Sequence, residues 1–164
     1  MQTSQQKVIV LDFGAQYGQL IARRVRDLHV YSEIMPCDAT AEEISAAGPS
    51  AIILSGGPAS VNEEGAPRVD PKIYELGIPV LGFCYGHQIT AVTLGGTVFH
   101  PEVGEYGRAE LHVKAGSKLF AGTPADQTVW MSHFDAVKDV PEGFVVTAST
   151  DVCPVAAMEN AERK

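Results

Sequence analysis

The sequence predicts an α/β fold with a mostly parallel sheet, helices on both of its faces and a β-rich second half. Up to about residue 94, uninterrupted apolar runs alternate with segments of helical spacing, which is typical of a parallel sheet covered on both faces. After Gly95-Gly96, strand-like runs follow one another with turns between them. The 164 residues, 45% hydrophobic and 20% charged, fit one ordinary globular domain.

The elements are expected at short apolar runs and at stretches with helical periodicity. The helix that starts at Ala41 has Asp38 or Thr40 as its cap and stops at Gly48-Pro49. In the first half we expect strands at residues 7–12, 31–35, 51–54 and 78–83, and helices at 17–28, 41–47, 71–76 and 85–94. In the second half we expect strands at residues 97–99, 109–113, 129–132, 144–149 and 155–158.

Three loops are predicted to meet at one edge of the parallel sheet. They are Asp12–Gln16, Ser55–Pro58 and Cys84–Gln88, and each follows an apolar strand. Ligands of open α/β sheets bind outside the carboxyl ends of the strands. This edge is therefore the predicted site.

Gly82-Phe83-Cys84-Tyr85-Gly86 is a nucleophile-elbow pattern, with cysteine in the nucleophile position between a strand and a helix. A thiol at a helix N-terminus is favoured as the reactive thiolate, which suits covalent acyl chemistry. The Tyr85 amide is the expected oxyanion donor, and the Ser55–Pro58 loop can supply a second one. The alternative for Cys84 is a packed cysteine in a Gly-rich turn, and the alternative for the Ser55–Pro58 loop is a plain turn that ends a strand. For Cys37 and Cys153 we adopt the interpretation of a packed cysteine.

Composition excludes several classes of function. The net charge is −8 and no basic run is longer than two residues, which argues against a nucleic-acid surface. Three cysteines without a CxxC pair argue against a disulfide scaffold and a metal site, and favour a reducing compartment. There is no apolar run long enough for a membrane span, and the start before Lys7 is polar. We expect a cytoplasmic protein without membrane contacts.

The chain resembles the class I (triad) glutamine amidotransferases, and within them the amidotransferase domain of GMP synthases. The resemblance runs from about Lys7 to Lys164. Its motifs are LDFGAQY at residues 11–17, SGGP at 55–58, GFCYGHQ at 82–88 and WMSH at 130–133. The fold that it implies is flavodoxin-like.

The resemblance also implies roles for single residues. Cys84 corresponds to the nucleophile, and Gly57 and Tyr85 to the backbone oxyanion donors. Gln88 and the pair Ser132 and His133 correspond to residues that hold the substrate, L-glutamine. The implied chemistry is glutamine hydrolysis through a thioester, which releases ammonia for the amination of XMP.

Further components are implied outside this chain. They are the ATP-pyrophosphatase (synthetase) domain, in cis or in trans, its ATP and Mg²⁺, and a homodimer of the full protein; no cofactor is expected in this domain. The triad His and Glu of the family follow the last residues present. We therefore expect residues 1–164 to be an amidotransferase domain cut before that segment and impaired as a glutaminase.

The histidines offer weaker candidates for the base. The segment Phe99–Val103 matches the base motif of the family, FHPEV, but about 15 Å of helix carries the chain away from Cys84 before it. We expect His100 and Glu102 to lie in a surface turn. His133, with Asp135 as its orienting carboxylate, is a second alternative. The Phe134 ring departs from the glycine that the family often has there.

Two other functions stay open. One is a non-catalytic glutamine-binding or docking module. The other is an amidotransferase of another pathway, such as anthranilate or carbamoyl-phosphate synthesis. Arg23 and Arg24 form either a solvated helix face or a docking surface for the synthetase domain.

Overall fold

The computed structural model describes residues 6–164, so residues 1–5 of the polar start lie outside the described part of the chain. The chain forms two compact units, one up to residue 89 together with 163–164, and one from 90 to 162. Each unit is described by itself below. In the described part of the chain no helix has the length and apolar character needed to cross a membrane.

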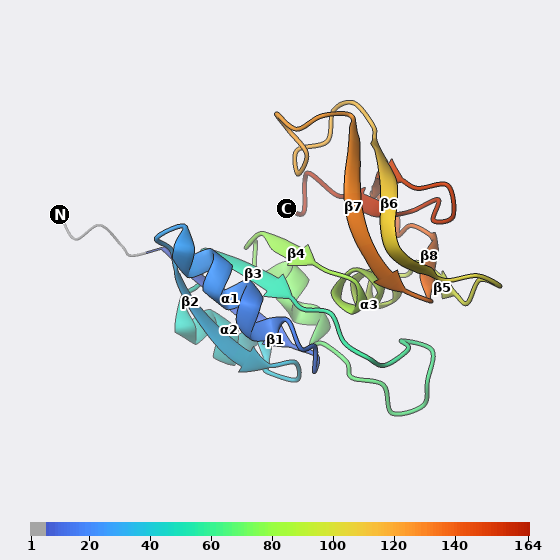
Figure 1. Cartoon of the computed structure of the whole chain (residues 1–164). Coiled ribbons are helices and arrows are strands. Elements are labelled where there is room, and N and C mark those ends of the chain that lie inside the picture. Colours follow the sequence, from blue (N-terminus) through green and yellow to red (C-terminus); the bar gives the residue numbers. More distant parts are fainter. Residues whose placement is uncertain (1–5) are drawn as a thin grey trace. The chain divides into compact units, whose positions relative to one another are not determined.

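A four-stranded parallel sheet in the order β2-β1-β3-β4 forms the first unit. The chain crosses the sheet in one direction from β1 to β2 and in the opposite direction from β2 to β3. The connecting helices α1 and α2 therefore cover opposite faces of the sheet (Figure 1). The strands are β1 (Lys7–Asp12), β2 (Tyr31–Pro36), β3 (Ala51–Leu54) and β4 (Val80–Gly82). The helices are α1 (Gly18–Asp27), α2 (Ala41–Ala47), the 3-10 helix η1 (Pro71–Glu75) and α3 (Tyr85–Thr93).

Local sequence signals set these boundaries. Thr40 caps α2: its hydroxyl accepts from the Glu43 amide at 3.2 Å, and the Glu43 carboxylate accepts from the Thr40 amide at 2.8 Å. Gly48, with φ +66°, ends the helix. The cap is thus Thr40 rather than Asp38. The strand expected at 78–83 is shorter, and the helix expected at 71–76 is a 3-10 turn.

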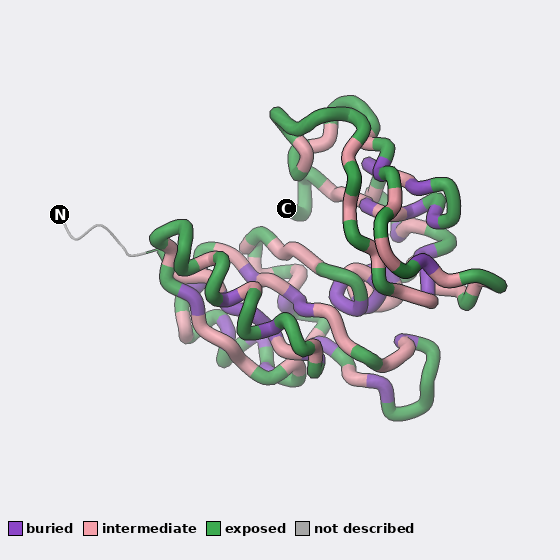
Figure 2. Tube along the Cα trace, viewed as in Figure 1, coloured by how far each residue is buried: buried purple, intermediate pink, exposed green. Residues whose placement is uncertain are grey.

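The core of this unit lies on the parallel strands, where buried segments follow β1 and β3 (Figure 2). Fully buried side chains come from both strands and from the helical elements α2 and η1. Each contributes roughly 1.5–3 kcal/mol by leaving water. They include Ile9, Leu11, Ile52, Leu54, Ile44 of α2 and Ile73 of η1.

The second unit is antiparallel, which confirms the predicted β-rich second half. One sheet has the order β10-β9-β6-β7, and β5 pairs with β8 in a second one. The alternation of exposed and half-buried residues along β7 is typical of a sheet with one face in solvent. The strands are β5 (Thr97–Phe99), β6 (Glu105–Val113), β7 (Asp126–His133), β8 (Ala136–Asp139), β9 (Val145–Ser149) and β10 (Ala157–Glu159).

Asp70 links two helical elements of the first unit and gives the fold an acid-sensitive contact. Its carboxylate accepts from the amides of Ala41 at 2.8 Å and Lys72 at 3.0 Å, and these hydrogen bonds lower the pKa of Asp70 below its usual 3.8. The ionised form is the one that stabilises the fold. This stabilisation is present above pH 3.8 and is lost as the pH falls through the lowered pKa.

We therefore expect Asp70→Asn to lower the free energy of unfolding at pH 7 more than at pH 3. Urea titrations at both pH values measure it. Asp27→Asn, on the exposed surface of α1, is the control. An equal loss at both pH values would contradict the role of the Asp70 charge.

Candidate active site

The carboxyl ends of β1, β3 and β4 lie side by side, as the sequence predicts. The Ser55 amide donates to the Leu11 carbonyl at 3.0 Å, and the Phe83 amide to the Leu54 carbonyl at 3.0 Å. The hydrogen-bond ladder therefore continues one residue past β3 and one residue past β4. It brings the first residues of the three predicted loops to the same edge.

Cys84 occupies a strained turn between β4 and α3. Its φ is +50°, in the left-handed region that costs a non-glycine residue about 1–3 kcal/mol. The Gly86 amide fixes the turn by donating to the carbonyls of Phe83 at 2.8 Å and Ser55 at 3.0 Å. The Cys84 residue is exposed. This is the elbow geometry predicted from the pattern, with the thiol presented at the N-terminus of α3.

The other two cysteines have environments that favour the inert thiol. Burial, followed by the charge of Asp38, raises the pKa of Cys37. Burial, followed by the charge of Glu105, raises the pKa of Cys153 to about 11. Because the thiolate is the nucleophile, neither environment suits covalent catalysis. Cys84 is the exposed member of the three.

The Ser55–Pro58 loop runs beside the thiol. A Cβ on Gly56 would lie 3.5 Å from the Cys84 Cβ, and a Cβ on Gly57 would lie 2.6 Å from the Phe13 carbonyl oxygen. Only glycine fits at position 57 without a shift of the backbone. The Ser55 hydroxyl donates to the Gly56 carbonyl at 2.9 Å and accepts from the Phe13 amide at 3.0 Å. The loop is therefore held in place next to Cys84, and the oxyanion role of Gly57 stays a prediction.

Tyr85 anchors the first turn of α3 through its side chain. The ring is buried and lies 5.2 Å from the Phe13 ring, and its hydroxyl donates to the Pro67 carbonyl at 2.6 Å. Desolvation raises the pKa of the Tyr85 hydroxyl. Gln88, also predicted at the site, is buried one turn further along α3. Its main-chain amide donates to the Cys84 carbonyl at 3.0 Å. The side chain of Tyr85 is structural, and the oxyanion role of its main-chain amide stays a prediction.

Ser132 and His133, the other predicted substrate residues, are the last two residues of β7 in the second unit. Ser132 is exposed. The His133 ring is engaged at both nitrogens: Nδ1 lies 3.0 Å from the Asp135 main-chain oxygen and Nε2 lies 3.1 Å from a carboxylate oxygen of Glu105. The alternative in which the Asp135 carboxylate orients His133 does not hold, because the carboxylate that contacts the ring is that of Glu105. A ring held at both nitrogens is a poor general base.

The Asp135 carboxylate instead contacts the ring of His100. Its Nδ1 lies 2.8 Å from Asp135 Oδ1, and its ring stacks on Phe134 with centroids 3.9 Å apart. Asp135 is buried, whereas the His100 side chain is 67% exposed. Glu102 is exposed as well, so the segment is the predicted surface turn. The sequence could not indicate the His100–Asp135 pair, since 35 residues separate its members.

The comparisons with known proteins agree with this geometry. The family model for class-I glutamine amidotransferases matches residues 9–164. GMP synthase [glutamine-hydrolyzing] of Streptomyces avermitilis is 63% identical over 158 residues, which are 96% of this chain and 30% of that protein. The Nocardia farcinica protein of the same name is 57% identical over 164 residues, 100% of this chain and 31% of its own length.

Solved structures give the same result. The crystal structure of a GMP synthase component from Thermoplasma acidophilum has a TM-score of 0.85 and 30% identity, and the match covers 96% of this chain and 79% of that one. A Methylobacillus flagellatus glutamine amidotransferase has a TM-score of 0.70 at 20% identity, covering 96% of this chain and 66% of that one, and so shares the fold. This chain spans about a third of the length of the curated relatives that it matches. It belongs to the class-I glutamine amidotransferase family.

Proposed function

We propose that the chain is the glutaminase part of a GMP synthase, which hydrolyses glutamine at Cys84 and supplies ammonia for the ATP-dependent conversion of XMP to GMP. The observation that carries the proposal is the exposed Cys84 thiol on a left-handed elbow at the start of α3. Relatives up to 63% identical that are named GMP synthase support the choice of pathway.

The reaction follows from the groups at the elbow. The Cys84 thiolate attacks the amide carbon of glutamine, and the Tyr85 and Gly57 amides stabilise the tetrahedral oxyanion. The amide nitrogen leaves as ammonia after it takes up a proton, and a γ-glutamyl thioester remains on Cys84. Water then attacks the thioester, which releases glutamate and the thiol. In sum, glutamine and water give glutamate and ammonia.

The substrate residues and the base complete the proposal. Gln88, Ser132 and His133 hold the amino-acid end of glutamine, as the family resemblance implies. The triad His and Glu come from a segment outside residues 1–164, so the chain alone turns over slowly. The synthetase part binds ATP and Mg²⁺, and the full protein is a cytoplasmic homodimer.

The test is ammonia release from glutamine by the chain, alone and with a separately produced synthetase part of a GMP synthase, XMP, ATP and Mg²⁺. We expect a weak rate that is unchanged by His100→Asn. Binding of glutamine without any turnover or labelling of Cys84 would instead indicate a binding module. Transfer of the released ammonia to an acceptor other than XMP would indicate an amidotransferase of a different pathway. A Cys84-dependent rate that His100→Asn abolishes would assign the base to the His100–Asp135 pair.

The exposed α1 surface supplies a candidate docking site for the synthetase part. Arg23 is exposed, and Arg24 pairs with Asp27 at 3.3 Å in a contact open to solvent, where ion pairs add little stability. We expect the double change Arg23→Glu and Arg24→Glu to weaken binding of the synthetase part about tenfold or more without unfolding the chain. Calorimetric titration measures it. The control is the equal charge change at Lys114 and Lys138, which are also exposed. Equal affinities for the two double variants would exclude this surface.

A further inference from the structure

Glu105, His133 and Cys153 form a cluster of metal-ligating groups inside the second unit. A carboxylate oxygen, a ring nitrogen and the thiol sulfur lie within 4.8 Å of one another. Glu105 and Cys153 are buried, and the His133 side chain is 14% exposed. The glutaminase chemistry proposed above uses neither Glu105 nor Cys153.

Hydrogen bonding fixes the direction of the His133 lone pair. Nδ1 faces the Asp135 main-chain oxygen at 3.0 Å, and a carbonyl can only accept, so Nδ1 carries a proton. In the neutral ring Nε2 then presents its electron pair to Glu105 Oε2 at 3.1 Å. Two electron pairs that face each other require a positive ion between them. That ion is either a shared proton or a metal.

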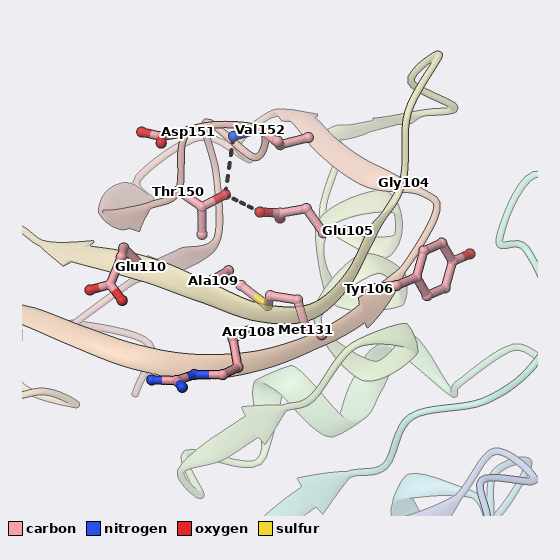
Figure 3. A pocket seen from close by; sticks show the side chains of 11 residues that line it. Gly104, Glu105, Tyr106, Arg108, Ala109, Glu110, Met131, Thr150, Asp151 and Val152 are labelled. Carbon is pink, nitrogen blue, oxygen red and sulfur yellow. Dashed lines mark hydrogen bonds between the residues drawn. The ribbon is translucent and has the colours of Figure 1, made fainter.

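The second carboxylate oxygen of Glu105 is held as well. The Thr150 hydroxyl accepts from the amides of Cys153 at 2.9 Å and Val152 at 3.3 Å, so its own proton is donated to Glu105 Oε1 at 2.6 Å (Figure 3). Glu105 Oε2 is left pointing at His133. Around bound metals, the other N–H of a ligating histidine usually donates to a carbonyl, and a ligating carboxylate is usually itself hydrogen-bonded. Both kinds of hydrogen bond are present here.

The chemistry of the donor set and the spacing of its nitrogen and oxygen atoms suit zinc. Zinc binds nitrogen and oxygen at about 2.0–2.2 Å in tetrahedral geometry, which puts two such ligands about 3.3 Å apart. The Nε2–Oε2 distance is 3.1 Å. A thiolate beside an imidazole and a carboxylate disfavours Mg²⁺ and Ca²⁺, which prefer oxygen ligands only.

A cavity borders the cluster at Glu105. It has a volume of about 350 Å³, and both Glu105 and Thr150 line it. Figure 3 shows their hydrogen bond at this wall, beside Asp151 and Val152. The cavity thus reaches the cluster on the Glu105 side, whereas His133 and Cys153 do not line it.

We propose that Glu105, His133 and Cys153 bind one Zn²⁺ ion, with water as the fourth ligand. The ion joins the start of β6, the end of β7 and the loop after β9. Binding displaces the proton of the Cys153 thiol and whichever proton the Glu105–His133 pair shares, because the ligating forms are thiolate, neutral imidazole and carboxylate. The site does not use Cys84, and its test does not require glutamine hydrolysis. It shares His133 with the residues proposed above to hold glutamine, and a ring bound at Nε2 to zinc and at Nδ1 to the Asp135 main-chain oxygen leaves the main chain of His133 for the substrate.

The test uses Co²⁺ and Zn²⁺ on the metal-stripped chain. We expect one equivalent of Co²⁺ to give the near-ultraviolet band of a cobalt–thiolate bond, and Zn²⁺ to displace it. Cys153→Ser should remove the band, whereas Cys37→Ser, the matched control, should keep it. Equilibrium dialysis should show affinity for Zn²⁺ reduced about 10–100-fold or more by Glu105→Gln and by Thr150→Val.

Other histidine–carboxylate pairs could bind metal adventitiously, in particular His100 with Asp135 and His112 with Asp126. Such binding would give no thiolate band in the unaltered chain and would keep its full affinity in Cys153→Ser, and that outcome would overturn the proposal. So would the absence of stoichiometric binding, which would leave a shared proton between His133 and Glu105. A further measurement needs no variant: Zn²⁺ should protect Cys153, and not Cys37, from iodoacetamide under mild denaturant. Equal labelling of both with and without Zn²⁺ would contradict the site.

Discussion

Replacing Cys84 by alanine is expected to lower the glutamine-dependent rate of the complete enzyme by about 10⁴–10⁶-fold, the size of effect seen when a covalent nucleophile is removed. In the proposed reaction the exposed Cys84 thiol forms the thioester, whereas the surroundings of Cys37 and Cys153 raise the pKa of their thiols. GMP formation from added ammonia should be unchanged, because that step bypasses Cys84. The two rates, measured on the same preparation, separate loss of the nucleophile from loss of the fold.

Cys37→Ala serves as the control for this prediction. It removes a half-buried thiol from the same unit, and we expect both rates to be retained. A Cys84→Ala enzyme that still used glutamine at more than a few per cent of the normal rate would contradict covalent catalysis at this position.

Gly86→Ala is expected to destabilise the first unit by about 3 kcal/mol, at the upper end for overpacking, because the new methyl group would meet backbone. Its Cβ would lie 2.7 Å from the Leu54 Cβ and against the Leu54 carbonyl oxygen. Inside a helix, alanine ordinarily stabilises relative to glycine by about 1 kcal/mol. A loss of stability, opposite in sign to the effect of helix propensity, would therefore report the close approach of α3 to β3.

Thermal and urea unfolding measure this effect, with Gly56→Ala as the matched control. A Cβ at Gly56 would meet its nearest neighbours at 3.5–3.9 Å, which is ordinary contact. The melting temperature of Gly86→Ala should fall by about 6–12 °C, and that of Gly56→Ala should change little. Equal stabilities would mean that the elbow tolerates a side chain at Gly86.

The first unit could be predicted closely because its signals are local. The strands Lys7–Asp12 and Ala51–Leu54 and the helix Ala41–Ala47 have the predicted bounds. Apolar runs, a capping box and a positive-φ glycine each determine structure within a few residues. The elbow is predictable for the same reason, since the positions that shape it lie within five residues of one another.

The second unit was harder to predict because its contacts are distant in sequence. The sequence does not predict strand β8, since Ala136–Asp139 is short and ends in two charged residues. Strand β6 begins at Glu105 rather than at Ala109, because its pairing with β7 extends to His133. That register brings Glu105 to His133, and no spacing rule relates either residue to Cys153.

The most direct test of the central claim is covalent trapping at Cys84. The chain is incubated with an electrophilic glutamine analogue, such as its chloromethyl ketone, and peptide mass spectrometry locates the adduct. We expect one adduct on the peptide that contains Cys84, suppressed by excess glutamine and absent in Cys84→Ala. An adduct on Cys37 or Cys153, or labelling of Cys84 that glutamine does not suppress, would contradict a glutamine site built on this elbow.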